Sequence, residues 1–211
     1  MYKTEQENFW SGKFGDEYVG RNSEQTMLGS NTALFSTVLS RTGGGVKRVI
    51  EFGSNIGINL RAIKMLIPSV ECSAIEINIK ALDVLKQFLP HENIYEGSIL
   101  DFDAEAVKEQ FDMALIKGVL IHINPEELKH VYERLYKCSK KYICIAEYYN
   151  PTPVEINYRG YENRLFKRDF AGEMMDKFTD LELVDYGFVY HRDNNFPQDD
   201  ITWFLLKKAE K

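Results

Sequence analysis

The sequence has few cysteines and no long apolar run, and both absences restrict the class of protein. Three of its 211 residues are cysteines, Cys72, Cys138 and Cys144, and they form no C-x-x-C pair. Buried, reduced thiols are therefore their expected state. No stretch is long enough to span a bilayer, and residues 1–10 lack the apolar core of a signal peptide. We expect a cytoplasmic protein with no membrane partner.

An excess of positive charge is also missing. The chain has 26 Lys and Arg against 32 Asp and Glu, a formal net charge of -6, whereas a general nucleic-acid binder needs a basic face. His91, His130 and His191 share no ligand spacing with His122, and the H-E-x-x-H pattern is absent. The G-x-S-x-G elbow of acyl-transfer enzymes is absent too. The sequence therefore predicts neither a nucleic-acid partner nor a metal site.

The most informative segment that is present follows the apolar pair Val49-Ile50. It is Glu51-Phe52-Gly53-Ser54-Asn55-Ile56-Gly57, which predicts a buried strand that ends at a carboxylate and turns through two glycines into a helix. The dinucleotide fingerprint G-x-G-x-x-G needs glycines where this chain has Asn55 and Ile58. The acidic residue before the turn instead favours a cationic cofactor, such as S-adenosylmethionine with its ammonium and sulfonium groups.

Beyond Gly45 strand and helix patterns alternate, which is typical of an α/β fold with a largely parallel sheet. Strands are predicted over residues 47–52, 70–76, 93–96, 112–116, 141–146, 181–190 and 201–206, the last two as a hairpin-like edge. Helices are predicted over residues 23–41 and 57–67, after Asn78, from the Asn124-Pro125 pair, and along the stripe Phe166, Phe170, Met174 and Phe178. Residues 147–167 show no clear period and are expected to form a long functional loop.

In such sheets ligands bind at the carboxyl ends of the strands. Glu76 ends the second strand, beside Ile77, and is expected to accept both ribose hydroxyls of a nucleoside; a helix-start acid near Asn78 is the alternative. Glu51 is expected to face the cofactor, and a structural carboxylate that accepts backbone N–H groups is the alternative. The remaining expected cofactor contacts lie in the turns after the strands: Gly53, Asn55, Gly57, Ile77, Ser98, Ile99, Lys117 and Gly118.

His122 is the candidate catalytic residue. It lies between the fourth strand and the Asn124-Pro125 helix start, beside the expected position of a transferable methyl group. Methyl transfer mainly requires alignment of the reactants, and a base matters only if the acceptor loses a proton. A histidine that merely holds the loop by hydrogen bonds is the equal alternative.

A group of tyrosines and cations follows the fifth strand. Hydroxylated aromatic rings with arginine forks suit a carboxylated or phosphorylated ligand, such as an acidic sugar. A solvated loop is the alternative for any single member. The residues expected to bind this acceptor are Tyr148, Tyr149, Asn150, Tyr158, Arg159 and Arg164.

The chain resembles the class I S-adenosylmethionine-dependent methyltransferases and, more narrowly, the pseudaminic acid biosynthesis-associated methylases. The blocks that carry this resemblance are residues 4–10, 14–18, 51–57, 117–125, 146–151, 164–173, 186–193 and 196–203. It implies a Rossmann-like, seven-stranded and mostly parallel sheet with an antiparallel last strand, helices on both faces and an N-terminal helical cap. It also implies a single domain over residues 1–211, divided into a cap (1–45), a cofactor-binding core (46–147) and an acceptor segment with the terminal strands (148–211).

The resemblance also implies roles for individual residues. In the wider class Glu51, Gly53 and Gly57 fall on the cofactor turn and Glu76 on the ribose acid, whereas Asn55 departs from the usual glycine. Asparagine tolerates the left-handed backbone better than most residues. In related small-molecule methyltransferases an N-terminal helix contacts the cofactor carboxylate through a tyrosine and an arginine, parts that Tyr18 and Arg21 would play here. In sugar N-methyltransferases of the class, a histidine near the position of His122 is proposed to assist the acceptor.

The expected activity is transfer of a methyl group from S-adenosylmethionine to an oxygen or nitrogen of a small polar acceptor. A nonulosonic, pseudaminic-type sugar acid, its nucleotide-activated form or a precursor is the expected acceptor, and another small amine or carboxylate metabolite is the alternative. A nicotinamide-dependent sugar oxidoreductase and a non-catalytic binding module of the same fold are the rival functions. The sequence makes no prediction of oligomeric state.

Overall fold

The computed structural model describes residues 2–21, 24–107 and 109–209, without the side chains of residues 21 and 24–26. The strands lie within two residues of the seven predicted segments, and two further strands lie in residues 147–167. The strands are β1 Arg48–Phe52, β2 Glu71–Glu76, β3 Ile94–Glu96, β4 Phe111–Lys117, β5 Ser139–Glu147, β6 Val154–Tyr158, β7 Tyr161–Lys167, β8 Leu181–Val189 and β9 Ile201–Lys208. The helices are α1 Glu5–Ser11, α2 Lys13–Arg21, α3 Glu24–Ser40, α4 Ile58–Leu66, α5 Ile79–Leu85, η1 His91–Asn93, η2 Leu120–His122, α6 Leu128–Cys138 and α7 Phe170–Lys177.

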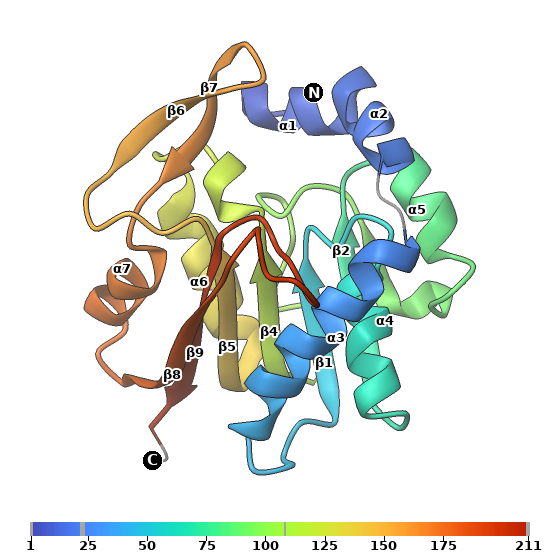
Figure 1. Ribbon diagram of the computed structural model, residues 1–211, viewed down its shortest axis with the longest axis vertical. Coiled ribbons are helices and arrows are strands. Elements are labelled where there is room, and N and C mark those ends of the chain that lie inside the picture. Colours follow the sequence, from blue (N-terminus) through green and yellow to red (C-terminus); the bar gives the residue numbers. More distant parts are fainter. Residues whose placement is uncertain (1, 22–23, 108, 210–211) are drawn as a thin grey trace.

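Seven of the strands form one sheet in the order β3-β2-β1-β4-β5-β9-β8 (Figure 1). Pairing is parallel from β3 to β5, and β9 runs antiparallel to both β5 and β8. This confirms the predicted mixed sheet with an antiparallel last strand. The two C-terminal strands pair with each other as expected, and β9 separates β8 from the parallel strands.

Apolar packing on both faces of the sheet explains why its central strands are apolar throughout. Val49 and Ile50 of β1 are both fully buried and belong to two separate core clusters. One cluster includes side chains of α3, α4 and α5, and the other includes side chains of α6 and α7. Because successive side chains of a strand point to opposite faces, these clusters confirm helices on both faces.

Two helix boundaries differ from the sequence prediction. Residues 124–127 form a turn in which Asn124 accepts hydrogen bonds from the backbone N–H groups of Glu126 and Glu127, and α6 begins only at Leu128. Phe166 lies in β7, not on the predicted helix, because Asp169 caps α7 by accepting from the Gly172 N–H. Spacing alone does not locate the first turn of a helix when a capping side chain starts the helix later in the sequence than the spacing indicates.

Residues 147–167 form a β-hairpin where a loop without regular structure is predicted. Strands β6 and β7 pair antiparallel, and Tyr158 faces Tyr161 across a two-residue turn. Both turn residues, Arg159 and Gly160, have positive φ angles of 53° and 87°, which is the backbone of a type I′ hairpin turn. The usual signal for that turn is Asn-Gly or Asp-Gly. The turn was therefore not predicted from the Arg-Gly pair.

Helices α1 and α2 lie across the carboxyl edge of the sheet, beside the β6–β7 hairpin (Figure 1). Thr4 and Glu7 form a reciprocal capping box at the start of α1, which fixes the point where the helix begins. The ring of Phe9 lies 5.0 Å from that of Tyr161, and the ring of Phe14 lies 5.9 Å from that of Tyr158. These contacts join the predicted N-terminal cap to the hairpin. In the described residues no helix combines the length and apolar character that a membrane crossing requires.

Candidate active site

A cavity lies at the carboxyl ends of β1, β2, β3 and β4, below the cap. It has about 1190 Å³ of space, its open mouth to solvent included. Its wall comes from the turns that follow these four strands, from η2, and from α1, α2 and α3. This is where ligands of open α/β sheets bind. It is also where the sequence predicts the cofactor.

The turn after β1 bends because three residues adopt the left-handed backbone. Gly53, Asn55 and Gly57 have φ angles of 72°, 49° and 78°. A Cβ on Gly53 would come within 2.7 Å of Val119, and a Cβ on Gly57 within 2.8 Å of Leu85. Asn55 adopts the left-handed backbone as expected, because asparagine tolerates this conformation better than most residues. Gly53 and Asn55 line the cavity, whereas Gly57 packs behind it.

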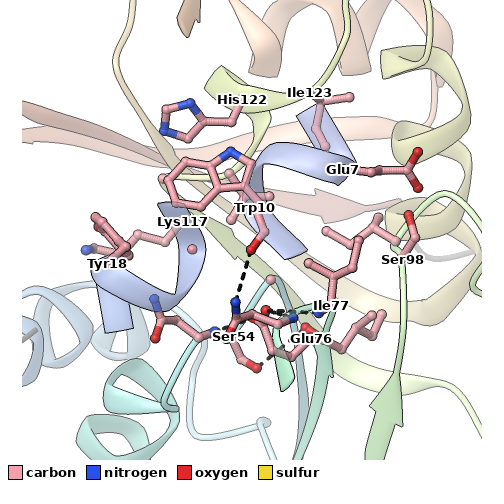
Figure 2. Close-up of a pocket in the computed structure, with 18 of the residues that line it drawn as sticks. Glu7, Trp10, Tyr18, Ser54, Glu76, Ile77, Ser98, Lys117, His122 and Ile123 are labelled. Carbon is pink, nitrogen blue, oxygen red and sulfur yellow. Dashed lines mark hydrogen bonds between the residues drawn. The ribbon is translucent and has the colours of Figure 1, made fainter. Parts of the chain in front are cut away.

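Glu76 holds the turn in place from the end of β2. One carboxylate oxygen accepts hydrogen bonds from the N–H groups of Ile77 (2.9 Å) and Asn78 (2.8 Å), and the other accepts from the N–H of Asn55 (2.7 Å), as Figure 2 shows in part. Burial raises the pKa of Glu76, and these three hydrogen bonds oppose that shift. A carboxylate has about four acceptor positions, so these bonds leave one position on a side chain that lines the cavity.

Glu51 does not line the cavity, in contrast to the prediction. Its side chain is completely buried, and one oxygen accepts from the Asn59 amide at 2.5 Å. Burial raises its pKa to about 8, although that bond and the nearby Lys117 lower it. Asn59 does line the cavity. Glu51 therefore reaches the cavity only through the amide that it orients.

Lys117, the last residue of β4, and Gly118 line the cavity, as predicted. A Cβ on Gly118 or on Gly97 would meet no atom of the described residues within 4 Å, so side chains there would take up cavity space. Lost hydration lowers the pKa of Lys117, and the carboxylates of Glu51, Asp199 and Glu147 raise it. Glu147 also accepts from the N–H groups of Val119 and Leu120, which fixes the turn that leads to η2.

His122 ends η2 and lines the cavity. Its Nδ1 lies 2.5 Å from the carbonyl oxygen of Arg164. A carbonyl only accepts, so Nδ1 carries the hydrogen and Nε2 carries the lone pair. The imidazole contacts the rings of Trp10 and Tyr158, with centroid distances of 4.6 and 4.9 Å. Burial lowers the pKa of His122 to about 4, although the Arg164 bond raises it. The side chain is therefore neutral at physiological pH.

The cap contributes cavity residues that the sequence does not single out. Gln6, Glu7 and Trp10 of α1 line the cavity together with the predicted Tyr18 of α2. The carbonyl of Trp10 accepts from the Asn78 amide at 3.2 Å, which ties α1 to the end of β2. Arg21 is the last residue of α2, but its side chain lies outside the described residues.

Four cavity-lining side chains carry a buried polar atom that has no hydrogen-bond partner among the described residues. These atoms are Gln6 Oε1, Glu7 Oε1, Trp10 Nε1 and Asn59 Oδ1. Buried polar atoms in folded proteins are nearly always satisfied. Their concentration on one cavity indicates a ligand with both donor and acceptor groups.

The predicted acceptor residues do not lie in the cavity wall. Tyr148 and Tyr149 lie against Lys167 and Phe204, and Asn150 bonds to Thr152. In the hairpin, Tyr158 supports His122, Arg159 lies 5.7 Å from the Tyr158 ring, and Arg164 pairs with Glu5. The hairpin carries Tyr158, Arg159 and Arg164 beside the cap, and the part of these residues in acceptor binding stays a prediction. Ser98, Ile99 and Ile77 do line the cavity, as predicted.

No protein-family model matches the sequence, and no curated protein matches it either. Solved structures do match. The 1,6-didemethyltoxoflavin-N1-methyltransferase of Burkholderia thailandensis, solved with 1,6-didemethyltoxoflavin and S-adenosylhomocysteine, gives a TM-score of 0.67 at 13% identity over 97% of this chain and 87% of its own. This chain has the class I methyltransferase fold.

Two further structures with this fold are also similar over most of their length. An amino pentose methyltransferase of calicheamicin biosynthesis from Micromonospora echinaspora, solved with S-adenosylmethionine, gives a TM-score of 0.62 at 10% identity and covers 92% of this chain and 95% of its own. A SAM-dependent methyltransferase from Leishmania major gives 0.65 at 13% identity over 96% and 80%. At identities this low, the similarity establishes the methyltransferase fold alone. The cofactor and the acceptor have to be argued from the residues that line the cavity.

The cavity residues fit S-adenosylmethionine. Glu76 keeps an acceptor position for a ribose hydroxyl, and the open space beside Gly97 and Gly118 leaves room for a nucleoside and an amino-acid chain. The oxygens of Glu7 and Asn59 that have no partner among the described residues suit amino and ammonium donors. In the described residues no group of three His, Cys, Asp or Glu side chains is arranged to hold a metal ion.

Proposed function

We propose that the protein is an S-adenosylmethionine-dependent methyltransferase that methylates an oxygen or nitrogen of a small polar acceptor. The observation that carries this proposal is the carboxylate of Glu76 at the end of β2, hydrogen-bonded to the Asn55 N–H of the glycine turn and facing the capped cavity. That arrangement occurs in a sheet whose inserted antiparallel strand β9 also characterises the methyltransferase fold.

The cavity residues divide into two groups by position. Glu76, Ile77, Ser98 and Ile99 follow β2 and β3 and would hold the adenosine part of the cofactor. The residues that would hold the methionine part follow β1 and β4 or belong to the cap: Gly53, Asn55, Lys117, Gly118 and Tyr18. When bound, the cofactor supplies a methyl group on a sulfonium, which an aligned lone pair can attack.

His122 would serve the acceptor. Its Nε2 has a lone pair and no hydrogen-bond partner among the described residues, so it can accept a hydrogen bond from an acceptor N–H or O–H and receive the proton as the new bond forms. The indole N–H of Trp10, whose ring contacts the same imidazole, can donate to a second polar atom of the acceptor. Together they would align the attacking atom.

A nonulosonic, pseudaminic-type sugar acid, its nucleotide-activated form or a precursor is the acceptor that we propose to test first. Arg159 supports this choice, because the hairpin turn places its exposed guanidinium next to Tyr158, which contacts His122. An acidic group outside the cavity would meet that cation. Other small amines and carboxylates remain the second class to screen.

Isothermal titration with S-adenosylhomocysteine and with NADH tests the proposed cofactor. We expect binding of S-adenosylhomocysteine, its loss in Gly53→Arg, and no binding of NADH. Binding of NADH alone would favour the nicotinamide-dependent oxidoreductase and overturn the proposal. A mass-spectrometric screen for the gain of one methyl group on sugar acids and amines then separates an enzyme from a binding module without turnover.

A further inference from the structure

Glu7 of α1 is a buried carboxylate in the cavity wall, only 7% exposed. Its Oε1 is buried and has no hydrogen-bond partner among the described residues. A buried acceptor without a donor is costly in any protein. This oxygen therefore marks a place where a ligand with a donor group fits.

The direction of the Glu7 side chain is fixed by its other oxygen. Oε2 accepts from the Thr4 backbone N–H at 2.8 Å and from the Thr4 hydroxyl at 3.1 Å, while the Glu7 N–H donates back to that hydroxyl at 3.2 Å. This reciprocal capping box holds the carboxylate at the start of α1. Oε1 is thereby left as a preoriented acceptor.

The start of α1 lies over the turn that follows β3. Lys3, just before the helix, donates to the Leu100 carbonyl at 3.4 Å and pairs with Asp101 at 2.6 Å. Figure 2 shows Glu7 and Ser98 on one side of the cavity and Tyr18 and Lys117 on the other. Glu7 is therefore at the end of the cavity that lies away from Lys117.

The wall at this end suits a flat heteroaromatic ring. Ile77 and Ile99 supply apolar surface, and Ser98, whose Oγ accepts from the Leu100 N–H at 3.0 Å, keeps its own hydroxyl hydrogen as a donor. A ring here would meet apolar side chains, one hydroxyl donor and the carboxylate acceptor of Glu7. An ionised carboxylate accepts and cannot donate, so the ring edge that faces Glu7 has to carry an N–H group.

We propose that Glu7 Oε1 accepts a hydrogen bond from the exocyclic amino group of a 6-aminopurine and so selects adenine over hypoxanthine. This inference rests on the proposed function, because the cofactor supplies the adenine. The cap then reads the nucleobase directly, in addition to covering the cavity. Hypoxanthine carries a carbonyl oxygen at the same position, which would face the carboxylate oxygen with no hydrogen between them.

Calorimetric titration of S-adenosylhomocysteine and S-inosylhomocysteine against the full chain, without acceptor, tests this selection. The wild type should prefer the adenosyl compound by about 10- to 150-fold, the range for one hydrogen bond to a charged group. Glu7→Gln should reduce this preference to about threefold or less, because an amide can accept from an amino group or donate to a carbonyl. Glutamine also keeps the capping box, so the variant retains the start of α1.

Glu5→Gln is the matched control. Glu5 lies on the same turn of α1, but its side chain is 76% exposed and pairs with Arg164 outside the cavity. It should keep the wild-type preference. Equal binding of both compounds by the wild type, or an unchanged preference in Glu7→Gln, overturns the role of Glu7 and leaves the proposed function standing. Failure of the wild type to bind either compound overturns both.

Discussion

The imidazole of His122 and the main-chain carbonyl of Arg164, 42 residues apart in sequence, share one hydrogen bond in which Nδ1 is the donor. Strand β7 supplies the carbonyl, so the β6–β7 hairpin sets the tautomer of the candidate base. The lone pair of Nε2 is available as a result. The hairpin thus acts on the cavity through main-chain geometry, although its cationic side chains lie outside the cavity wall.

Replacement of His122 by asparagine distinguishes the role of Nδ1 from that of Nε2. The asparagine amide can still donate to the Arg164 carbonyl, but nothing takes the place of Nε2. We expect kcat to fall by about 10²- to 10⁴-fold, the usual contribution of a general base, while the Kd for S-adenosylhomocysteine changes little. Steady-state kinetics and calorimetry measure both. His130→Asn, at a histidine paired with Glu127 outside the cavity, is the control; a nearly unchanged kcat in His122→Asn would mean that the ring only holds the loop.

Acidification should reveal the unusual environment of His122. Its pKa is about 4 in the folded state, against 6.5 ordinarily. The unfolded chain therefore binds this proton more readily, so the free energy of unfolding falls as pH falls from about 6.5 to 4. We expect the ring resonances of His122 in NMR to remain those of the neutral imidazole at pH 5.5. A midpoint near 6.5 would contradict the desolvated position described above.

Gly118 and Gly43 form a matched pair for testing the cavity. Their φ angles are 66° and 62°, and among the described residues no atom lies within 4 Å of a Cβ built on either, but of the two only Gly118 lines the cavity. Alanine at each position should cost about 1 kcal/mol of stability through left-handed strain. Only Gly118→Ala should weaken S-adenosylhomocysteine binding, by about tenfold or more. Equal affinities in the two variants would place the ligand elsewhere.

Trp10 should report on ligand binding and orient the acceptor. In Trp203→Phe the remaining indole is Trp10, and its fluorescence should change when S-adenosylhomocysteine is added, because Trp10 lines the cavity. Trp10→Phe keeps a ring against His122 but removes the unpartnered N–H. We expect a higher acceptor KM with little change in melting temperature. An unaltered KM and kcat would show that the indole N–H makes no hydrogen bond to the methyl acceptor.

Glu51 should make stability depend on pH in the alkaline range. Its pKa is raised to about 8 from 4.5 by burial, so the folded protein retains a proton that the unfolded chain releases. Stability from this group therefore falls as pH rises from about 4.5 to 8. Glu51→Gln lacks this linkage and should gain about 4 kcal/mol relative to wild type between pH 5 and pH 9, since about three pKa units of the linkage fall in this range and each is worth about 1.4 kcal/mol. Denaturant unfolding at both pH values measures the gain.

The exposed Glu71, at the start of β2, provides the control for this prediction. Glu71→Gln should give the same small difference from wild type at both pH values. If the stability difference of Glu51→Gln did not grow with pH, the carboxylate would be ionised in the folded state. Its role beneath Asn59 would then be that of a partner for Lys117.

The fold could be predicted from the sequence because its signals are local. Buried parallel strands are short apolar runs such as Val49-Ile50, and Asn78, predicted as a helix cap, does accept from the Ala81 N–H. The hairpin of β6 and β7 was missed because its Arg-Gly turn lacks the usual residues, although Val154, Ile156 and Tyr158 alternate with polar residues along β6. Local patterns indicate an element only where burial or turn chemistry constrains the residue types.

The cavity wall at the strand ends was also largely predictable, since Gly53, Glu76, Ser98 and Gly118 lie at or just after the carboxyl ends of strands that meet at one edge. The cap side was not. Glu7 has a local signal, the T-x-x-E capping box at Thr4, but that pattern predicts only the start of a helix. Nothing in the sequence indicates that this side chain lines a cavity.

By itself, the sequence determined where the seven strands of the main sheet lie, the glycine turn after β1 and the carboxylate at the end of β2. Backbone conformation and hydrophobic burial determine these features over a few residues. Only the tertiary structure decided which side chains enclose the cavity. It removed Glu51 and Arg164 from the cavity wall, placed Glu7 and Trp10 in it, and set the tautomer of His122 through a carbonyl from β7. Such choices depend on contacts between segments far apart in the chain, and these contacts form only when the cap and the hairpin pack against the sheet edge.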